Sequence, residues 1–145
     1  MTTIPPPEPP KIEVIENYHP NGKLKEKGML VNGKEEGLWT SWWENGQKQV
    51  EVIFKDGKKD GLETQWFENG KKQIELTNKD GKKDGLMNIW YENGQKEYEW
   101  TFKDSKLDGL WTYWYENGQK NIEGTYKDGR KISVKEWNED GSVKN

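Results

Sequence analysis

The sequence has no cysteine, one histidine and no long hydrophobic run. Without cysteine the chain forms no disulfide, offers no thiol nucleophile and holds no metal through thiolates. No segment approaches the roughly 20 apolar residues that cross a membrane as a helix. The 23 basic and 26 acidic residues alternate along the chain and give a net charge of -3. Nucleic-acid binding, which needs clustered lysine and arginine, is therefore not expected.

The first residues, MTTIPPPEPP, contain no hydrophobic core of a signal peptide. As written, the chain is expected in the cytoplasm, whereas a leader removed upstream would leave no trace in it. Residues 1–11 are predicted to be a proline-rich tail, extended as polyproline II or disordered. This tail serves as a spacer or as a docking ligand for an aromatic groove. Residues 12–145 are predicted to form the folded domain.

Hydrophobic residues make up only 30% of the chain and charged residues 34%, a balance that by itself favours disorder. Nine tryptophans, six tyrosines and three phenylalanines oppose this tendency, since each aromatic side chain buries roughly 150–250 Å². The aromatic residues recur at regular positions. The composition therefore predicts a repeat array and not a globule with one central core.

A repeat of 24 residues runs through the chain: WWENGQKQVEV, which starts at Trp42, returns with small changes at Trp66, Trp90 and Trp114. The units are centred on Gly22, Gly46, Gly70, Gly94, Gly118 and Gly141. Within each unit, Asn-Gly and Asp-Gly turn signals separate runs rich in β-branched and aromatic residues. The predicted fold is all-β, a linear array of about five to six 24-residue antiparallel β-hairpins forming an elongated, twisted single sheet.

The hydrophobic pattern favours a three-residue loop with Gly46 in the left-handed conformation, which pairs Trp43 with Gln47 and Trp42 with Lys48. This register predicts one face that carries Leu38, Thr40, Trp42, Val50, Val52 and Phe54. It predicts a second face that carries the aromatic row Trp43, Phe67, Tyr91 and Tyr115 beside the acidic row Glu51, Glu75, Glu99 and Glu123. A single sheet of this width is expected to curl on itself or to bury one face against another chain.

The pattern [WFY]-E-N-G-x-K, followed by [FY]-K-D-G-K-x-D-G-L, resembles the MORN repeat in its bacterial variant. In this sequence the first full copy runs from Trp43 to Leu62, and the likeness covers roughly residues 12–145. The resemblance implies a row of hairpins that acts as a binding or assembly scaffold, often dimeric, with proposed contacts to proteins and lipids. Bacterial members are often labelled antitoxins of toxin–antitoxin systems. Pro20 and Ser133 break the pattern, so the first and last units are expected to be caps.

Catalytic chemistry is not expected, because an enzyme needs an asymmetric constellation whereas these carboxylates recur in every unit. No cofactor is implied. His19 is expected to be an exposed residue beside a turn, and the acidic row is expected to pair with lysines across strands or to lie near the aromatic rings. The Asp-Gly loops lack calcium-loop spacing and are expected to be turns, not metal sites. Gly61 either lets an aromatic ring lie over it or serves a turn.

Residues that depart from the repeat are the candidate binding site. A specific site on a regular array is expected to be formed by residues that differ from one unit to the next. The second face carries the aromatic row, which three further aromatic residues enlarge in two units only. The candidate residues are Trp39, Trp43, Phe67, Tyr91, Trp111, Tyr113 and Tyr115. The alternative is that these rings fill the inside of a curled array.

Three functions fit the sequence. The first is a non-enzymatic scaffold that binds another protein, a toxin that it neutralises being one such partner. The second is a module that binds carbohydrate or the cell envelope (lipid or glycan), by analogy with other hairpin repeats rich in Trp and Tyr. The third is a self-assembling element whose exposed edge strands stack end to end, and by implication of the family a homodimer. The first is favoured, because the pattern-breaking aromatics lie on a regular frame without catalytic groups.

Overall fold

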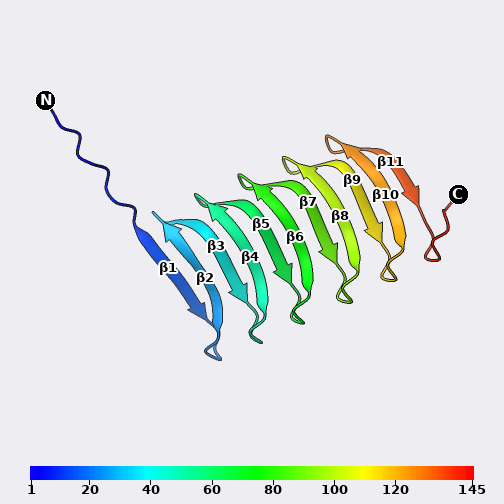
Figure 1. Ribbon diagram of the computed structural model, residues 1–145, viewed down its shortest axis with the longest axis horizontal. Coiled ribbons are helices and arrows are strands. Elements are labelled where there is room, and N and C mark those ends of the chain that lie inside the picture. The colour runs from blue at the N-terminus through cyan, green and yellow to red at the C-terminus, as the bar shows by residue number, and fades with distance from the viewer.

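The computed structural model describes residues 1–145 and contains one antiparallel sheet of eleven strands, which lie in the order in which the chain makes them (Figure 1). The strands are β1 (Ile12–Tyr18), β2 (Leu24–Val31), β3 (Lys34–Trp42), β4 (Lys48–Lys55), β5 (Lys58–Trp66), β6 (Lys72–Lys79), β7 (Lys82–Trp90), β8 (Lys96–Lys103), β9 (Lys106–Trp114), β10 (Lys120–Lys127) and β11 (Arg130–Glu136). The predicted all-β array of hairpins is thereby confirmed. The structure has no helix long and apolar enough to cross a membrane.

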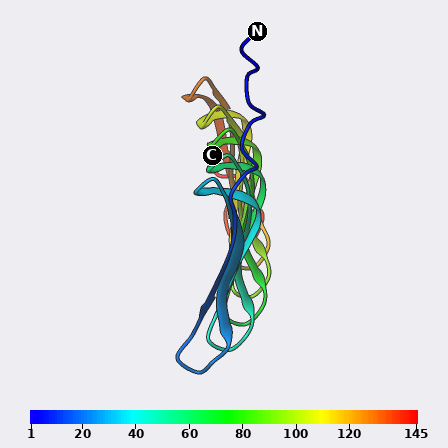
Figure 2. The same cartoon turned by 90° about the vertical axis from the view of Figure 1, so that its left-hand side faces the viewer.

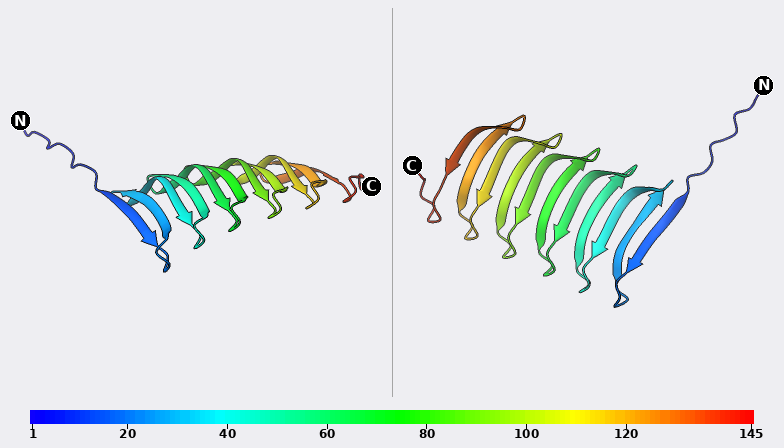
Figure 3. Two further views of the ribbon diagram at one scale, coloured as in Figure 1. Left: turned by 60° about the horizontal axis from the view of Figure 1, so that its bottom comes forward. Right: turned by 180° about the vertical axis from the view of Figure 1, so that it is seen from behind.

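The sheet is a single layer, and no other part of the chain covers either face (Figures 2 and 3). Only 10 of 145 residues are buried, and no large side chain is fully enclosed. The accessible surface is 9851 Å², whereas a compact monomer of this mass would expose about 7,800 Å². The sheet bends and twists but does not close, so the expectation that it curls on itself is wrong for the single chain.

Two kinds of turn alternate along the array, and both need left-handed backbone. Three of the five two-residue turns have Asp-Gly, as at Asp56 and Gly57 with φ of 53° and 76°, and the others have Asn32-Gly33 and Asp104-Ser105. The longer loops contain Asn-Gly: the Trp43 amide donates to the Gln47 carbonyl at 2.8 Å, and Gly46 has a φ of 86°. The predicted three-residue loop and the pairing of Trp42 with Lys48 are confirmed.

The predicted distribution of side chains between the two faces is wrong, because a β-bulge follows each Asn-Gly loop. Trp42 pairs with Lys48, but Ser41 pairs with Val50, so Gln49 is an extra residue without an opposite partner. One extra residue moves every later side chain of the strand to the other face. Val52 therefore lies opposite Trp39, not beside Thr40, and the same shift recurs in the next three units.

One face, here called the ladder face, repeats its side chains faithfully. In the first full unit it carries Leu38, Thr40 and Trp42 on β3 and Lys48 and Glu51 on β4, and equivalents follow every 24 residues. The acidic row thus lies on this face and not, as predicted, beside the aromatic row.

The ladder face is held by pairs within a strand and by contacts between units. Lys72 bonds Glu75 at 2.6 Å, three residues along β6, so the expected cross-strand lysine partners are replaced by same-strand ones. The ammonium of Lys48 lies 5.7 Å from the ring centroid of Trp66 in the next unit. Leu38 remains 56% exposed. The ladder face is therefore a regular frame that links each hairpin to the next.

The two ends of the sheet differ. At the C-terminal end the chain turns back, Trp137 bridges Val143, and the Lys144 amide donates to the Glu136 carbonyl at 2.9 Å. This return covers part of the outer edge of β11. At the N-terminal end, residues 1–11 form no strand and lead away from β1 (Figure 1).

Candidate functional site

The opposite face, here called the variable face, changes its side chains from unit to unit. Its central row crosses the sheet from β2 to β10, with successive members on neighbouring strands. The row is Gly28, Trp39, Val52, Glu63, Leu76, Met87, Trp100, Trp111 and Gly124. Because the frame behind it is constant, the differences along this row are not required by the fold.

Aromatic side chains gather at two places on the variable face. Near the N-terminal end, Trp39 and Phe54 meet edge to face, with ring centroids 6.3 Å apart. Near the C-terminal end a larger group comprises Tyr98, Trp100, Phe102, Trp111, Tyr113 and Tyr126, here called the C-terminal aromatic patch. Within it, Tyr98 and Tyr113 stack at 4.4 Å with an interplanar angle of 11°. Such rings offer apolar area with little flexibility, a composition common at protein interfaces.

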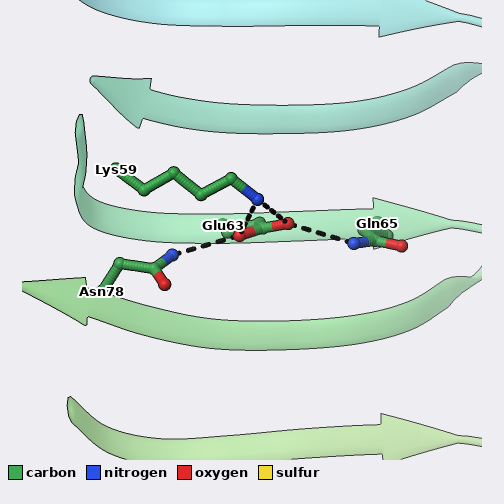
Figure 4. A network of polar contacts seen from close by, with 4 residues as sticks. All are labelled: Lys59, Glu63, Gln65 and Asn78. Carbon is green, nitrogen blue, oxygen red and sulfur yellow. Dashed lines mark hydrogen bonds and ion pairs between the residues drawn. The ribbon is translucent and has the colours of Figure 1, made fainter. Parts of the chain in front are cut away.

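Between the two aromatic regions lies a polar cluster on β5 and β6; Figure 4 shows its four residues, Lys59, Glu63, Gln65 and Asn78. The carboxylate of Glu63, whose side chain is 6% exposed, accepts hydrogen bonds from Lys59 Nζ at 3.0 and 3.1 Å. Gln65 Nε2 and Asn78 Nδ2 each donate to it at 3.1 Å. A buried carboxylate is costly unless it is paired and hydrogen-bonded, and this one is both. At the position of Glu63, other units have Trp39, Met87 and Trp111.

Burial raises the pKa of Glu63, but the hydrogen bonds from Lys59, Gln65 and Asn78 outweigh it, so the net pKa lies below the ordinary glutamate value. A lowered pKa stabilises the folded state above the unfolded pKa, and this contribution is lost as the pH falls through the folded value. The stabilisation is thus complete at neutral pH and disappears in acid.

Glu63→Gln is expected to lower the free energy of unfolding at pH 7. The difference from wild type is expected to shrink as the pH falls below about 4, because Glu63 then becomes protonated. Urea denaturation of both proteins from pH 7 to pH 3 measures it. Glu68→Gln, which removes an exposed carboxylate without an ion pair, controls for the loss of one negative charge. An advantage of equal size at pH 3 and pH 7 would contradict the assignment.

The cluster borders an open cavity of about 580 Å³ on the variable face. Its lining combines charged and apolar side chains, among them Lys59, Glu63, Lys83, Leu76, Met87 and Phe102. The ammonium of Lys83 lies 5.3 Å from the ring centroid of Phe102. No group of three or more His, Asp or Glu side chains in the chain is placed to hold a metal ion.

The predicted site residues lie on one face but play two roles. Trp39, Trp111 and Tyr113 lie within the aromatic regions of the variable face. Two members of the predicted aromatic row, Trp43 and Tyr91, reach across to the next unit. The indole of Trp43 donates to the Trp66 carbonyl at 3.2 Å, and the hydroxyl of Tyr91 to the Trp114 carbonyl at 2.7 Å.

The other two members of the row differ from each other. Tyr115 donates to the Trp137 carbonyl at 2.9 Å, while Phe67, at the same position of its unit, has no polar atom to do so. The row therefore links consecutive hairpins beside the Asn-Gly loops.

His19 belongs to this same row, which the sequence analysis missed. It lies 24 residues before Trp43, and its Nε2 is 2.8 Å from the Trp42 carbonyl. The side chain is partly buried, so the predicted exposed position is wrong. Counting one period back from Trp43 would have found it.

Rings do lie over glycines, but not at Gly61. A β-carbon at Gly61 would meet Ile53, and this glycine has a φ of 124°, so its role is in the backbone. The indoles of Trp39 and Trp111 instead cover Gly28 and Gly124. These glycines belong to the return strands, where the sequence offers no turn signal.

The remaining residues of the variable face were not predicted as site residues. The predicted register put Val52 on the other face, and with it Trp100 and Phe102, which are equivalent to Val52 and Phe54 two units later; the bulge makes this assignment wrong. The polar cluster was missed, although its members stand out when units are aligned: Asn78 corresponds to Phe54, Phe102 and Tyr126. The alignment shows that this unit differs, but not that its polar side chains bond one another.

A linear array of hairpins with one constant and one variable face is typical of a repeat protein that binds through its surface. The MORN repeat variant family matches residues 14–32, 35–56, 59–80, 83–104 and 107–128. These matches cover most of the chain, which therefore belongs to the MORN repeat variant family. Repeats of this family generally act as non-enzymatic binding modules. No curated protein matches the chain.

Proposed function

We propose that this chain is a non-enzymatic scaffold that binds another protein across its variable face. The observation that carries the proposal is the uncovered C-terminal aromatic patch on a sheet only one layer thick. Four of its rings, Tyr98, Trp100, Trp111 and Tyr113, depart from the repeat, and nothing else in the chain covers the patch. The six rings are half-buried on an uncovered face, and aromatic side chains so placed are where binding energy concentrates in protein interfaces.

The dimensions favour a macromolecular partner. The chain exposes 9851 Å², roughly 2,000 Å² above a compact monomer, although the extended tail contributes part of this excess. A standard interface needs about 800 Å² from each partner. Eleven strands spaced about 4.8 Å apart give a surface nearly 50 Å long, which suits a protein surface or segment better than a small molecule.

Trp100→Ala is expected to weaken the captured partner's binding at least about thirtyfold, since tryptophans at the centre of an interface contribute about 2 kcal/mol or more. Trp90→Ala is the matched control, because Trp90 is also half-buried but lies on the ladder face. Partners are captured from the source cells by wild type, identified by mass spectrometry, and titrated against both variants. Far-ultraviolet circular dichroism checks that each variant is folded. Equal affinities for Trp100→Ala and wild type would refute the proposal.

Neutralisation of a toxin is one specific form of this function, motivated by the resemblance described above. Its test is co-expression of the chain with the captured partner. If the partner is a toxin, growth is restored by wild type and not by Trp100→Ala. A partner that is harmless when expressed alone would exclude this form and leave the scaffold function in place.

A further inference from the structure

From the polar cluster and its cavity we infer which chemistry the partner presents at the centre of the variable face: a carboxylate beside an apolar side chain, as in an acidic and hydrophobic peptide segment. This inference rests on the proposed function and makes it more specific. It concerns the cavity bordered by Lys59, Glu63, Asn78, Lys83 and Phe102.

The carboxylate of Glu63 has no capacity left for a partner's cation. Each carboxylate oxygen accepts two hydrogen bonds: Oε1 from Lys59 and Gln65, and Oε2 from Lys59 and Asn78. A carboxylate offers about four lone-pair sites, and all four are occupied here. An arginine or lysine of a partner would have to displace one of these donors from a site where the side chain is only 6% exposed.

The free charge in the cavity is positive. Glu63 neutralises Lys59, whereas Lys83 takes part in none of the ion pairs of the structure. Lys83 is exposed, and its ammonium lies over the ring of Phe102 with the centroid 5.3 Å away. Its three N–H donors are therefore available to an anion that approaches across this ring.

The rest of the lining is apolar, which defines the second half of the motif. Ile74, Leu76, Met87 and Phe102 contribute carbon surface beside the two lysines. A carboxylate on a segment that also carries an aliphatic or aromatic side chain can pair with Lys83 and cover this surface together. The aromatic regions on either side would then hold the flanking parts of the same segment.

The fold does not require this arrangement. In the next unit the positions of Glu63, Gln65 and Asn78 are filled by Met87, Ile89 and Phe102, on the same backbone. Three polar residues that bond one another replace apolar residues in one unit only. Such a coordinated break in a local rule points to function, since it costs desolvation without helping the frame.

The test uses random peptides displayed on phage and selected on the immobilised full chain. Selected peptides are expected to be enriched in Asp or Glu next to an apolar residue. One such peptide and its amide version, with Gln or Asn in place of the acid, are then titrated against wild type, Lys83→Gln and Lys82→Gln. Lys82 is the neighbouring exposed lysine and lies outside the cavity.

Wild type and Lys82→Gln are expected to prefer the acidic peptide at least about tenfold, as a charge-assisted hydrogen bond implies, and Lys83→Gln to bind both peptides equally. A general structural defect would weaken both peptides alike and leave their ratio unchanged, which would overturn the inference. If the selected peptides are neutral or basic and bind less tightly to Trp100→Ala, the inference about an acidic partner is overturned and the proposed function is left intact. A library without any peptide that depends on Trp100 would overturn both.

Discussion

Gly28→Ala is expected to lower the free energy of unfolding by about 1–3 kcal/mol, although alanine is ordinarily better than glycine in a strand. The cause is local: a β-carbon at Gly28 would overlap the indole of Trp39, which lies flat on this glycine and donates to the Met29 carbonyl at 3.2 Å. The ring must leave its position to make room. Urea denaturation monitored by circular dichroism measures the change.

The control for this prediction is a double-mutant cycle. In a Trp39→Ala background the second change, Gly28→Ala, should be neutral or slightly stabilising, because the three atoms nearest to the added β-carbon all belong to that indole. In the equivalent cycle with Gly124→Ala and Trp111→Ala, removing the indole should restore only part of the lost stability. A β-carbon at Gly124 would overlap both the Trp111 indole and the Ser133 carbonyl of the next strand. A Gly28→Ala penalty that persists without the indole would show that the ring is not the cause.

Replacing the polar cluster in the unit centred on Gly70 by the residues of the unit centred on Gly94 should increase the free energy of unfolding while weakening partner binding. The triple variant Glu63→Met, Gln65→Ile, Asn78→Phe replaces the polar cluster by the residues that the same backbone carries one unit later. Replacing a buried ionic network by apolar residues that fit is commonly neutral or stabilising by about 1–4 kcal/mol, and the phenylalanine, which is larger than asparagine, has the open cavity beside it. Binding should fall, because the new phenylalanine occupies part of the cavity.

The single variant Asn78→Ala should lower the free energy of unfolding, in contrast to the triple variant. It removes one donor from the buried carboxylate and leaves an empty space, so a loss of about 1–3 kcal/mol is expected. Urea denaturation measures the change in stability of each variant, and peptide titration on the same samples measures the change in binding. If the triple variant is instead clearly less stable than wild type, the cluster is there for folding and not for recognition.

Much of the fold could be predicted from the sequence because its signals are local. The 24-residue period can be read directly from the sequence, and the Asp-Gly turns and the loop around Gly46 follow from backbone chemistry within a few residues. The pairing of Trp42 with Lys48 followed from the loop type and was confirmed. The candidate site was only partly predictable: Trp39, Trp111 and Tyr113 stood out as departures from the period, whereas the return-strand residues Trp100 and Phe102 were placed on the wrong face.

By itself, then, the sequence determined that this chain makes a row of hairpins, where each hairpin turns, and which residues depart from the common frame. Only the tertiary structure decided which side chains share a face. A single extra residue, Gln49 in the first full unit, reverses the alternation of the strand that follows. The hydrophobic pattern favoured the arrangement without the extra residue, but both arrangements leave apolar residues on both sides of an open sheet, so burial does not enforce either of them. The bond from Asn78 to Glu63 was equally hidden, because it joins β5 to β6 between residues 15 positions apart.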